Sequence, residues 1–306
     1  MLRHFINLRD WSKEDLLELL ERAVRLKAAY KRGEIYQPLK GKTLAMIFEK
    51  ASTRTRVSFE VGMYQLGGQA LNINSQTSQL GRGETYADTA KVLSHYVNAI
   101  MLRTFKQSNL VEMAAAASVP VINGLSDLLH PCQVLADLLT IQEYKGNLAK
   151  LKIVWLGDSN NMSNTWLEAA MIFGFELVLA IPESFKVSAD LWQRVMAGHY
   201  ANITINHSAE EAVRGADVLY ADTWISMGQE ELEAAAKKAI LRPFQINSSL
   251  LERADVKAIV LHCLPAHREE EITSVVIDGP QSRVFDQAEN RLHLQKALLE
   301  KLISVN

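Results

Sequence analysis

The chain has 306 residues and a formal net charge of −2, and 48% of its residues are hydrophobic while 22% are charged. This length predicts two domains of ordinary size, large enough to bury a core without disulfides or metals. The near-neutral charge argues against a nucleic-acid partner, because phosphate contacts need an excess of cations.

The two cysteines and the N-terminal segment indicate a cellular compartment. Cys132 and Cys263 lie far apart and form neither a disulfide framework nor a paired zinc-ligand pattern. Residues 1–20 lack the apolar core of a signal peptide and the Arg/Ser-rich pattern of an import sequence. No run approaches the roughly 18 apolar residues that span a bilayer. We therefore expect a cytoplasmic protein without a membrane segment.

The first half of the chain alternates apolar runs with helical patterns. Ser12 suits an N-cap, and Asp15 adds negative charge to the first turn of the helix that follows. Gly67 suits the left-handed C-cap of a second helix, and Pro131 suits the first position of a later one. In chain order we expect a helix from Ser12, a strand at 42–48, a helix at 52–66, a strand at 99–105, a helix at 110–118, a strand at 119–124 and a helix at 131–144.

After residues 146–151 the alternation restarts, so we expect a domain boundary there. The predicted strands lie at 152–158, 176–182, 216–222 and 257–265. The predicted helices lie at 165–174, 188–198, 208–214 and 229–239, with a last helix from about Ala288. Alternating strands and helices in both halves predict an α/β fold with two doubly wound parallel sheets.

The segment FEKASTRTR (48–56) follows a predicted strand and opens a predicted helix. Unpaired backbone N–H groups and the positive end of a helix dipole meet there, which suits a phosphate ligand. It is not a nucleotide-binding Walker loop, because no GxxxxGK[ST] motif occurs in the chain. The alternative is an N-cap serine with arginines in surface ion pairs. The polar side chains at this point are those of Ser52, Thr53, Arg54, Thr55 and Arg56.

Two further features of the first half lie where a strand ends or a helix begins. In HPCQ (130–133), His130 takes the N-cap position and Gln133 lies in the first helical turn, where both suit a carbonyl or amide ligand. Arg103 ends a predicted strand and suits bidentate anion recognition. The alternatives are a capping histidine and a structural ion pair. Because ligands of open α/β sheets bind at the carboxyl ends of strands, we expect these side chains near one site.

The second half carries motifs that suit an amino acid. GDSNN (157–161) lacks the GxGxxG fingerprint of dinucleotide binding, and its asparagines suit either a ligand or a turn. In DTWISMGQEE (222–231), Asp222 ends a strand, and Ser226 with Gln229 matches a capping box. This helix start suits a substrate carboxylate while Asp222 suits an ammonium group, although a capped helix alone would explain the pattern.

HCLPAH (262–267) ends the last predicted strand. Cys263 suits a nucleophile, a metal ligand or a substrate contact, and a buried inert thiol is the alternative. A zinc site from His262, Cys263 and His267 lacks the rest of a ligand set, so we expect no metal.

Together these motifs resemble the aspartate/ornithine carbamoyltransferase family over essentially the whole chain. STRTR with HPCQ is similar to the family's carbamoyl-phosphate half, and DTWISMG with HCLP to the ornithine branch. The resemblance implies carbamoyl transfer to the δ-amine of ornithine, giving citrulline and phosphate in arginine biosynthesis, without a cofactor. It implies a carbamoyl-phosphate domain at 1–147, to which a C-terminal helix at 288–306 returns, and an ornithine domain at 148–287. It also implies a homotrimer with sites near subunit interfaces.

The resemblance also assigns site residues. Gln79 falls in a loop that reaches a neighbouring subunit's site, and Arg56 is a structural neighbour. The catalytic residues implied are Arg103, His130, Asp222 and Cys263. The carbamoyl-phosphate-binding residues implied are Ser52, Thr53, Arg54, Thr55, Gln79, Arg103, His130, Gln133, Cys263, Leu264 and Arg291. The ornithine-binding residues implied are Asn161, Asp222, Ser226 and Met227.

The rival interpretations differ in substrate or in class. Aspartate, putrescine or an acylated ornithine would be the acceptor of a sister enzyme, but DTWISMG offers no cation for a second carboxylate. A non-catalytic amino-acid-binding protein would need neither STRTR nor HPCQ. A nicotinamide dehydrogenase is disfavoured by the missing glycine fingerprint.

Overall fold

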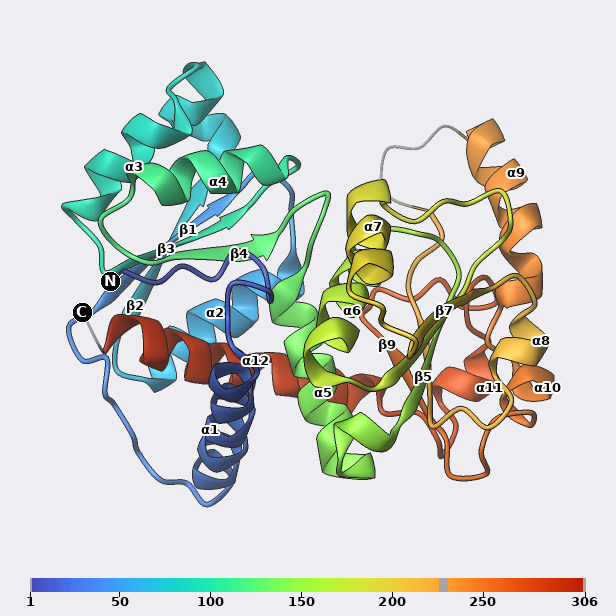
Figure 1. Ribbon diagram of the computed structural model, residues 1–306. Coiled ribbons are helices and arrows are strands. Elements are labelled where there is room, and N and C mark those ends of the chain that lie inside the picture. Colours follow the sequence, from blue (N-terminus) through green and yellow to red (C-terminus); the bar gives the residue numbers. More distant parts are fainter. Residues whose placement is uncertain (1, 226–230, 305–306) are drawn as a thin grey trace. The chain divides into compact units, whose positions relative to one another are not determined.

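The computed structural model describes residues 2–225 and 231–304, and the chain folds into two compact units (Figure 1). The first unit holds Met1–Leu139 and Glu289–Asn306, and the second holds Thr140–Ala288. The division falls inside helix α5 (Pro131–Lys145), earlier than the change after residue 147 that the sequence predicts. No helix within the described residues is both long enough and apolar enough to cross a membrane.

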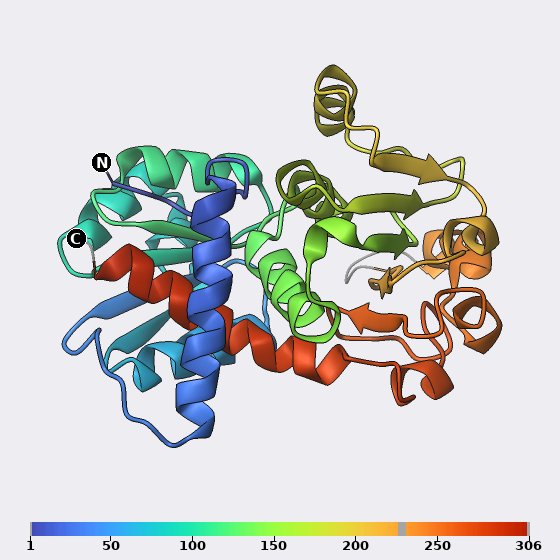
Figure 2. The ribbon, with the colours of Figure 1, turned by 60° about the horizontal axis from the view of Figure 1, so that its bottom comes forward.

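The first unit is built on a four-stranded parallel sheet in the order β2-β1-β3-β4. Its strands are β1 (Thr43–Phe48), β2 (Gln69–Asn74), β3 (Ala99–Arg103) and β4 (Val121–Leu125). Its further helices are α1 (Lys13–Lys31), α2 (Thr53–Gln65), α3 (Tyr86–Ser94), α4 (Gln107–Ala116) and α12 (Val284–Ile303). Alternate residues of β1 and β3, such as Ile47 and Leu102, pack against α3 and α4. Helices α2 and α12 lie on the other face (Figures 1 and 2).

The predicted helix caps of the first unit are confirmed. The side chain of Ser12 accepts a hydrogen bond from Asp15 N at the start of α1, and Ser52 accepts one from Thr55 N at the start of α2. Gly67 has φ +85° just beyond the end of α2, a conformation that glycine adopts without a Cβ clash. These caps place residues 52–55 at the carboxyl end of β1.

Gly62 lets α2 and α12 approach closely. A Cβ at this position would meet Lys296 Cγ at 3.4 Å and Leu292 Cδ1 at 3.7 Å. The close approach sets the last helix against the C-terminal part of α2. At the start of α2, Arg291 of the same last helix contacts Thr55.

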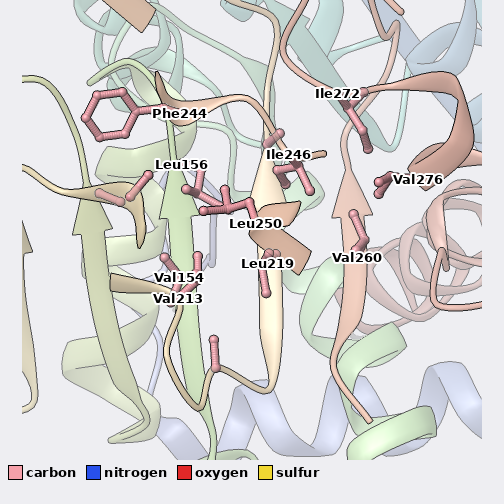
Figure 3. Packing of buried hydrophobic residues seen from close by; sticks show 14 of the residues in the cluster. Val154, Leu156, Val213, Leu219, Phe244, Ile246, Leu250, Val260, Ile272 and Val276 are labelled. Atoms are coloured by element: carbon pink, nitrogen blue, oxygen red, sulfur yellow. The ribbon is translucent and has the colours of Figure 1, made fainter. Parts of the chain in front are cut away.

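The second unit is built on a five-stranded parallel sheet in the order β7-β6-β5-β8-β9. Its strands are β5 (Lys152–Leu156), β6 (Glu176–Ala180), β7 (Ile203–Asn206), β8 (Val218–Ala221) and β9 (Ile259–His262). Its further helices are α6 (Asn161–Phe173), α7 (Ala189–Ala197), α8 (Ala209–Ala212), α9 (Glu231–Leu241), α10 (Ser248–Leu251) and α11 (Ser274–Ile277). Figure 3 shows Val154, Leu219 and Val260 of three neighbouring strands in one apolar cluster with Ile246 and Leu250.

The prediction of two parallel-sheet α/β domains is confirmed, but some elements were missed. Strands β2 and β7 and helix α3 have no counterpart in the sequence prediction. β2 is an edge strand whose residues are all exposed or half-buried, so it lacks the apolar run that marks a central strand. Helix α6 begins four residues before the predicted 165, because Asn160 caps it through the N–H groups of Met162 and Ser163. Helix α12 likewise begins at Val284, before the predicted Ala288.

Candidate active site

The start of α2 presents hydroxyls and backbone N–H groups at the carboxyl end of β1. Ser52 caps the helix with a 3.3 Å bond from Thr55 N, so the capping interpretation of this serine is correct. Thr55 is buried, whereas Thr53 is exposed. Arg56 is exposed and lies 3.5 Å from Glu60 on the outer face of the helix, as a structural neighbour would.

Two predicted residues from distant parts of the sequence meet beside Thr55. Arg291, on α12, donates through Nη2 to Thr55 Oγ1 at 3.0 Å and through Nη1 to Gln133 Oε1. Gln133 lies in the first turn of α5, and its Nε2 donates to Asp137 Oδ1 at 2.7 Å. All four side chains are buried. This chain of hydrogen bonds ties the starts of α2 and α5 to the last helix.

Arg103 and His130 complete a cationic cluster in the first unit. Burial, followed by the charges of Arg291 and Arg54, lowers the pKa of Arg103 to about 10, so this guanidinium stays protonated at neutral pH. Burial and the charges of Arg291 and Arg103 lower the pKa of His130 well below its ordinary value, which keeps the imidazole neutral. The Nε atom of Arg103 is buried and has no hydrogen-bond partner within residues 2–225 and 231–304.

A buried donor that lacks a partner costs free energy, so Arg103 Nε indicates a place for an acceptor that binds later. Like charges that lower one another's pKa favour an anion at the same place, because an anion relieves their repulsion. The cluster therefore suits a small anionic ligand that also carries a polar group for neutral donors such as His130 and Gln133.

Glu49, which the sequence interpretation gave no role, connects the loops that carry this cluster. It follows β1 directly, and its carboxylate accepts hydrogen bonds from Thr104 Oγ1 and Phe105 N at 2.7 and 2.9 Å. It also accepts bonds from Tyr86 and Asn109. Its backbone N–H donates to Arg103 O at 2.9 Å. Glu49 therefore fixes the end of β3, and with it the backbone of Arg103.

The second unit carries a different constellation, centred on Asp222 at the carboxyl end of β8. Its Oδ1 accepts from Thr223 N at 2.7 Å and from Cys263 Sγ at 2.8 Å, and its Oδ2 accepts from Asn160 Nδ2 at 2.8 Å. Asn160, the neighbour of the predicted ligand residue Asn161, therefore contacts Asp222. Asn161 is the first residue of α6, and its carbonyl accepts from Thr165 Oγ1.

The loop after β9 is held by a buried histidine and glutamate. Leu264 N donates to His262 Nδ1 at 2.8 Å, so this nitrogen is the acceptor and Nε2 carries the proton. Nε2 lies 3.0 Å from Glu271 Oε1, and both side chains are fully buried. Leu264 has φ +59° and precedes a cis peptide bond to Pro265. The pair therefore shapes the turn that presents Cys263 to Asp222.

The second unit also holds a group of potential metal ligands. Ligand atoms of His267, Glu270 and Glu271 lie within 4.8 Å of one another. Glu270 already pairs with Lys238 at 2.5 Å, and Glu271 already accepts from His262 and from His267 N. Both ring nitrogens of His262 are engaged as well, so the zinc alternative built on His262 and Cys263 would have to break the turn that positions Cys263.

Gln79 joins neither constellation among the described residues, and two further predicted residues are not described. Gln79 is exposed, at the start of the 3-10 turn η2 (Gln79–Arg82), where its carbonyl accepts from Glu84 N. Ser226 and Met227, with the predicted capping box to Gln229, lie outside the described residues.

Two family models match the chain in sequence order. Residues 3–143 match the carbamoyl-P binding domain of the aspartate/ornithine carbamoyltransferases, and residues 149–302 match their Asp/Orn binding domain. The chain belongs to the aspartate/ornithine carbamoyltransferase family. The carbamoyl-P model spans most of the cationic cluster, and the Asp/Orn model spans Asp222 and Cys263 together with α12.

Relatives that align over nearly their full length are named ornithine carbamoyltransferase. The chain is 52% identical to an ornithine carbamoyltransferase of Syntrophus aciditrophicus, over 99% of this chain and 100% of the relative. It is 49% identical to an anabolic ornithine carbamoyltransferase of Pseudomonas aeruginosa, over 99% of this chain and 97% of the relative. The structure of the ornithine carbamoyltransferase from Pyrococcus furiosus matches with a TM-score of 0.94 and 48% identity, over 98% and 97% of the two chains.

Proposed function

We propose that this chain is an ornithine carbamoyltransferase, which transfers the carbamoyl group of carbamoyl phosphate to the δ-amine of L-ornithine. The products are citrulline and phosphate. The observation that carries the proposal is the cationic cluster of Arg54, Arg103 and Arg291 in a chain that is about half identical to relatives of this name. The anabolic name of the Pseudomonas relative supports a role in arginine biosynthesis and, with it, a place in the cytoplasm.

The proposed carbamoyl-phosphate domain comprises residues 1–147 with the C-terminal helix 288–306, and it contains the first unit. Ser52, Thr53, Arg54 and Thr55 would hold the phosphate at the start of α2, where helix dipole and N–H groups favour an anion. Arg103 would bridge the phosphate and the carbonyl oxygen, and its buried Nε supports this role. His130 and Gln133 would orient the carbamoyl group, and Arg291 would complete the phosphate contacts.

The proposed ornithine domain comprises residues 148–287, which form most of the second unit. Asp222 would bind the α-amino group, and Asn161, Ser226 and Met227 would contribute contacts to the amino-acid end. Cys263 and Leu264 would lie by the δ-amine and the carbamoyl nitrogen. The three hydrogen bonds that orient Asp222 support this assignment, because a fixed carboxylate recognises an ammonium group at lower entropic cost.

The proposed reaction is an attack of the neutral δ-amine on the carbonyl carbon. A C–N bond forms, the bond from carbon to the bridging oxygen breaks, and phosphate leaves with the electron pair and accepts the amine proton. Arg103, Thr55 and the neutral His130 would stabilise the charge that develops on the carbonyl oxygen. The cationic surroundings would also lower the pKa of the lysine-like δ-amine, which must lose its proton to react.

The test is citrulline formation from carbamoyl phosphate with four acceptors compared side by side: ornithine, aspartate, putrescine and N-acetylornithine. We expect rapid turnover of ornithine alone, with one phosphate released for each citrulline. Turnover of another acceptor would refute the assignment of Asp222 and Cys263 and leave the carbamoyl-phosphate side intact. No turnover with any acceptor would refute the proposal that this chain is a carbamoyltransferase.

We also propose a homotrimer with sites near its subunit interfaces. The exposed position of Gln79 in η2 supports the expectation that this loop reaches a neighbouring subunit. Sedimentation equilibrium should give three times the chain mass of 34.3 kDa. A monomer or dimer that retains full activity would refute the trimer and the role of Gln79 across an interface.

A further inference from the structure

Asp137 is a buried carboxylate one helical turn after Gln133. Its side chain is fully buried, and its Oδ1 lies 2.7 Å from Gln133 Nε2. The two residues are four positions apart on α5, a spacing at which side chains of a helix face each other. Through this hydrogen bond Asp137 acts on the side chain of Gln133.

The two neighbours of Gln133 determine which way its amide faces. Arg291 donates to Oε1, and a guanidinium has no acceptor that could receive a bond from the amide nitrogen. On the other side, Asp137 Oδ1 accepts a hydrogen bond from the amide nitrogen, which holds that nitrogen next to Asp137. A flipped amide would lose both hydrogen bonds. The oxygen therefore faces Arg291.

The orientation of the Gln133 amide determines which group of a ligand it can bind. Arg291 donates to Thr55 Oγ1 through its other terminal nitrogen, so Gln133 Oε1 lies on the side of the cationic cluster. A carbonyl oxygen has two lone pairs, and Arg291 uses one of them. The second is an acceptor for an N–H group of a ligand. Cations and hydroxyls recognise a phosphate, but an amide oxygen recognises an amino group.

We propose that Asp137 is a positioning residue that holds the Gln133 amide oxygen toward the ligand and so makes the site select a carbamoyl group over an acyl group that ends in methyl. This inference rests on the proposed function, because it takes carbamoyl phosphate as the ligand. Asp137 itself does not touch the substrate. With Asp137→Asn, the new side chain can donate to a flipped Gln133 as well as accept from the unflipped one, so Arg291 alone then favours the original orientation.

The test compares two stable analogues of carbamoyl phosphate that differ in one group. Phosphonoacetamide carries the amino group, and acetonylphosphonate carries methyl in its place. Their Kd values are measured by calorimetry without ornithine, for the wild type, Asp137→Asn and the control Asp286→Asn. Asp286 accepts from Tyr144 in the second unit and plays no part in the cluster.

We expect the wild type and the control to prefer phosphonoacetamide by about tenfold or more, which is the scale of one hydrogen bond in a desolvated site. In Asp137→Asn the Kd of phosphonoacetamide should rise about tenfold, while that of acetonylphosphonate changes less than about twofold. If Asp137→Asn does not fold, Asp137→Ser is measured in its place, because serine lacks the carboxylate and has a smaller side chain.

An equal loss for both analogues would overturn the inference, because a merely structural role would weaken the phosphate contacts too. An unchanged preference in the folded variant would overturn it as well. Either result is distinct from failure of the proposed function, which would appear as a wild type that forms no citrulline.

Discussion

The two units place opposite charges at the same topological position. In the first unit, Arg54, Arg103 and Arg291 come from three elements, and burial, followed by the charges of Arg291 and Arg54, brings the pKa of Arg103 to about 10. In the second unit, a carboxylate, Asp222, lies at the end of β8 among donors from Asn160, Thr223 and Cys263. Both positions are carboxyl ends of parallel strands, where open α/β sheets bind ligands. The chain therefore separates recognition of an anion from recognition of an amine.

The two positions also differ in how they are supported. The cationic cluster depends on side chains far apart in the sequence, because Arg291 donates to Thr55 and Gln133 from the last helix. Mutual repulsion makes the empty cluster unfavourable, and an anion relieves it. Asp222 is held in place by three hydrogen bonds from its neighbours and keeps acceptor capacity for an ammonium group. We therefore expect substitutions in the first unit to act on the carbamoyl-phosphate step and those in the second unit on ornithine.

The largest expected effect is that of Arg103→Leu. Removing a buried cation aimed at the developing oxyanion should lower kcat for citrulline formation by about 10³-fold. Arg25→Leu is the matched control, because Arg25 is exposed on α1 in an ion pair with Glu21 and should leave kcat unchanged. Steady-state measurements of kcat for the two variants test this prediction. A loss of less than about tenfold in Arg103→Leu would contradict the assignment of this residue.

Asp222→Asn should have the next largest effect. It keeps the size of the side chain but removes the charge that binds the α-ammonium group, so kcat/KM for ornithine should fall about 10²-fold. The KM for carbamoyl phosphate should stay within about twofold. Asp88→Asn, at an exposed ion pair with Lys91 in the first unit, should change neither value. If Asp222→Asn weakened the recognition of ornithine and of carbamoyl phosphate equally, the assignment of the two substrates to separate units would be wrong.

Asn160→Ala should combine a loss of stability with a loss of ornithine recognition. It removes the N-cap of α6, which costs about 1 kcal/mol in the free energy of unfolding, and frees Asp222 to move. We expect kcat/KM for ornithine to fall about tenfold. Asn247→Ala removes a comparable cap from α10 and should lower stability alone. If Asn160→Ala lowered only the urea midpoint, Asn160 would be a cap and not a positioning residue.

The smallest expected effect is a dependence of stability on pH. Burial and the charge of Lys296 lower the pKa of the fully buried His293 to about 4, against opposing contributions from Glu289. Below an ordinary pKa of about 6.5, the unfolded chain binds a proton that the folded chain does not. Stability is therefore complete above that pH and falls as the pH drops toward 4.

When the pH is lowered from 7.5 to 5.5, this histidine should reduce the free energy of unfolding of the wild type by about 1 kcal/mol. Urea unfolding at the two pH values should give a smaller loss for His293→Gln. The buried His130 contributes in the same direction, because its pKa is also lowered. An identical loss in wild type and His293→Gln would contradict the assigned pKa.

Local signals made most of the fold predictable. Ser12, Ser52 and Gly67 mark helix ends through their own hydrogen bonds or backbone angle, so their roles can be inferred from neighbouring residues. Strand β2 could not be found in this way, because an edge strand has few buried side chains and no clear alternation. The division within α5 depends on contacts that only the folded chain makes.

The supporting residues of the candidate site were harder to find than the residues they support. Arg103 and Asp222 end strands and could be identified by position. Glu49, Asn160 and Asp137 act through side chains that are distant in sequence or one helical turn away. FEKASTRTR and GDSNN contain Glu49 and Asn160, and Asp137 lies four residues after HPCQ, but a glutamate after a strand or an aspartate in a helix carries no signal of its own. Only the fold assigns their partners.

The measurement that tests the separation of the two units most directly is calorimetric binding of phosphonoacetamide to the wild type, Arg103→Leu and Asp222→Asn without ornithine. We predict that Asp222→Asn binds the analogue with the wild-type Kd, although it turns ornithine over poorly, and that Arg103→Leu binds it at least about tenfold more weakly. Equal weakening in both variants, or wild-type binding by Arg103→Leu, would contradict the account.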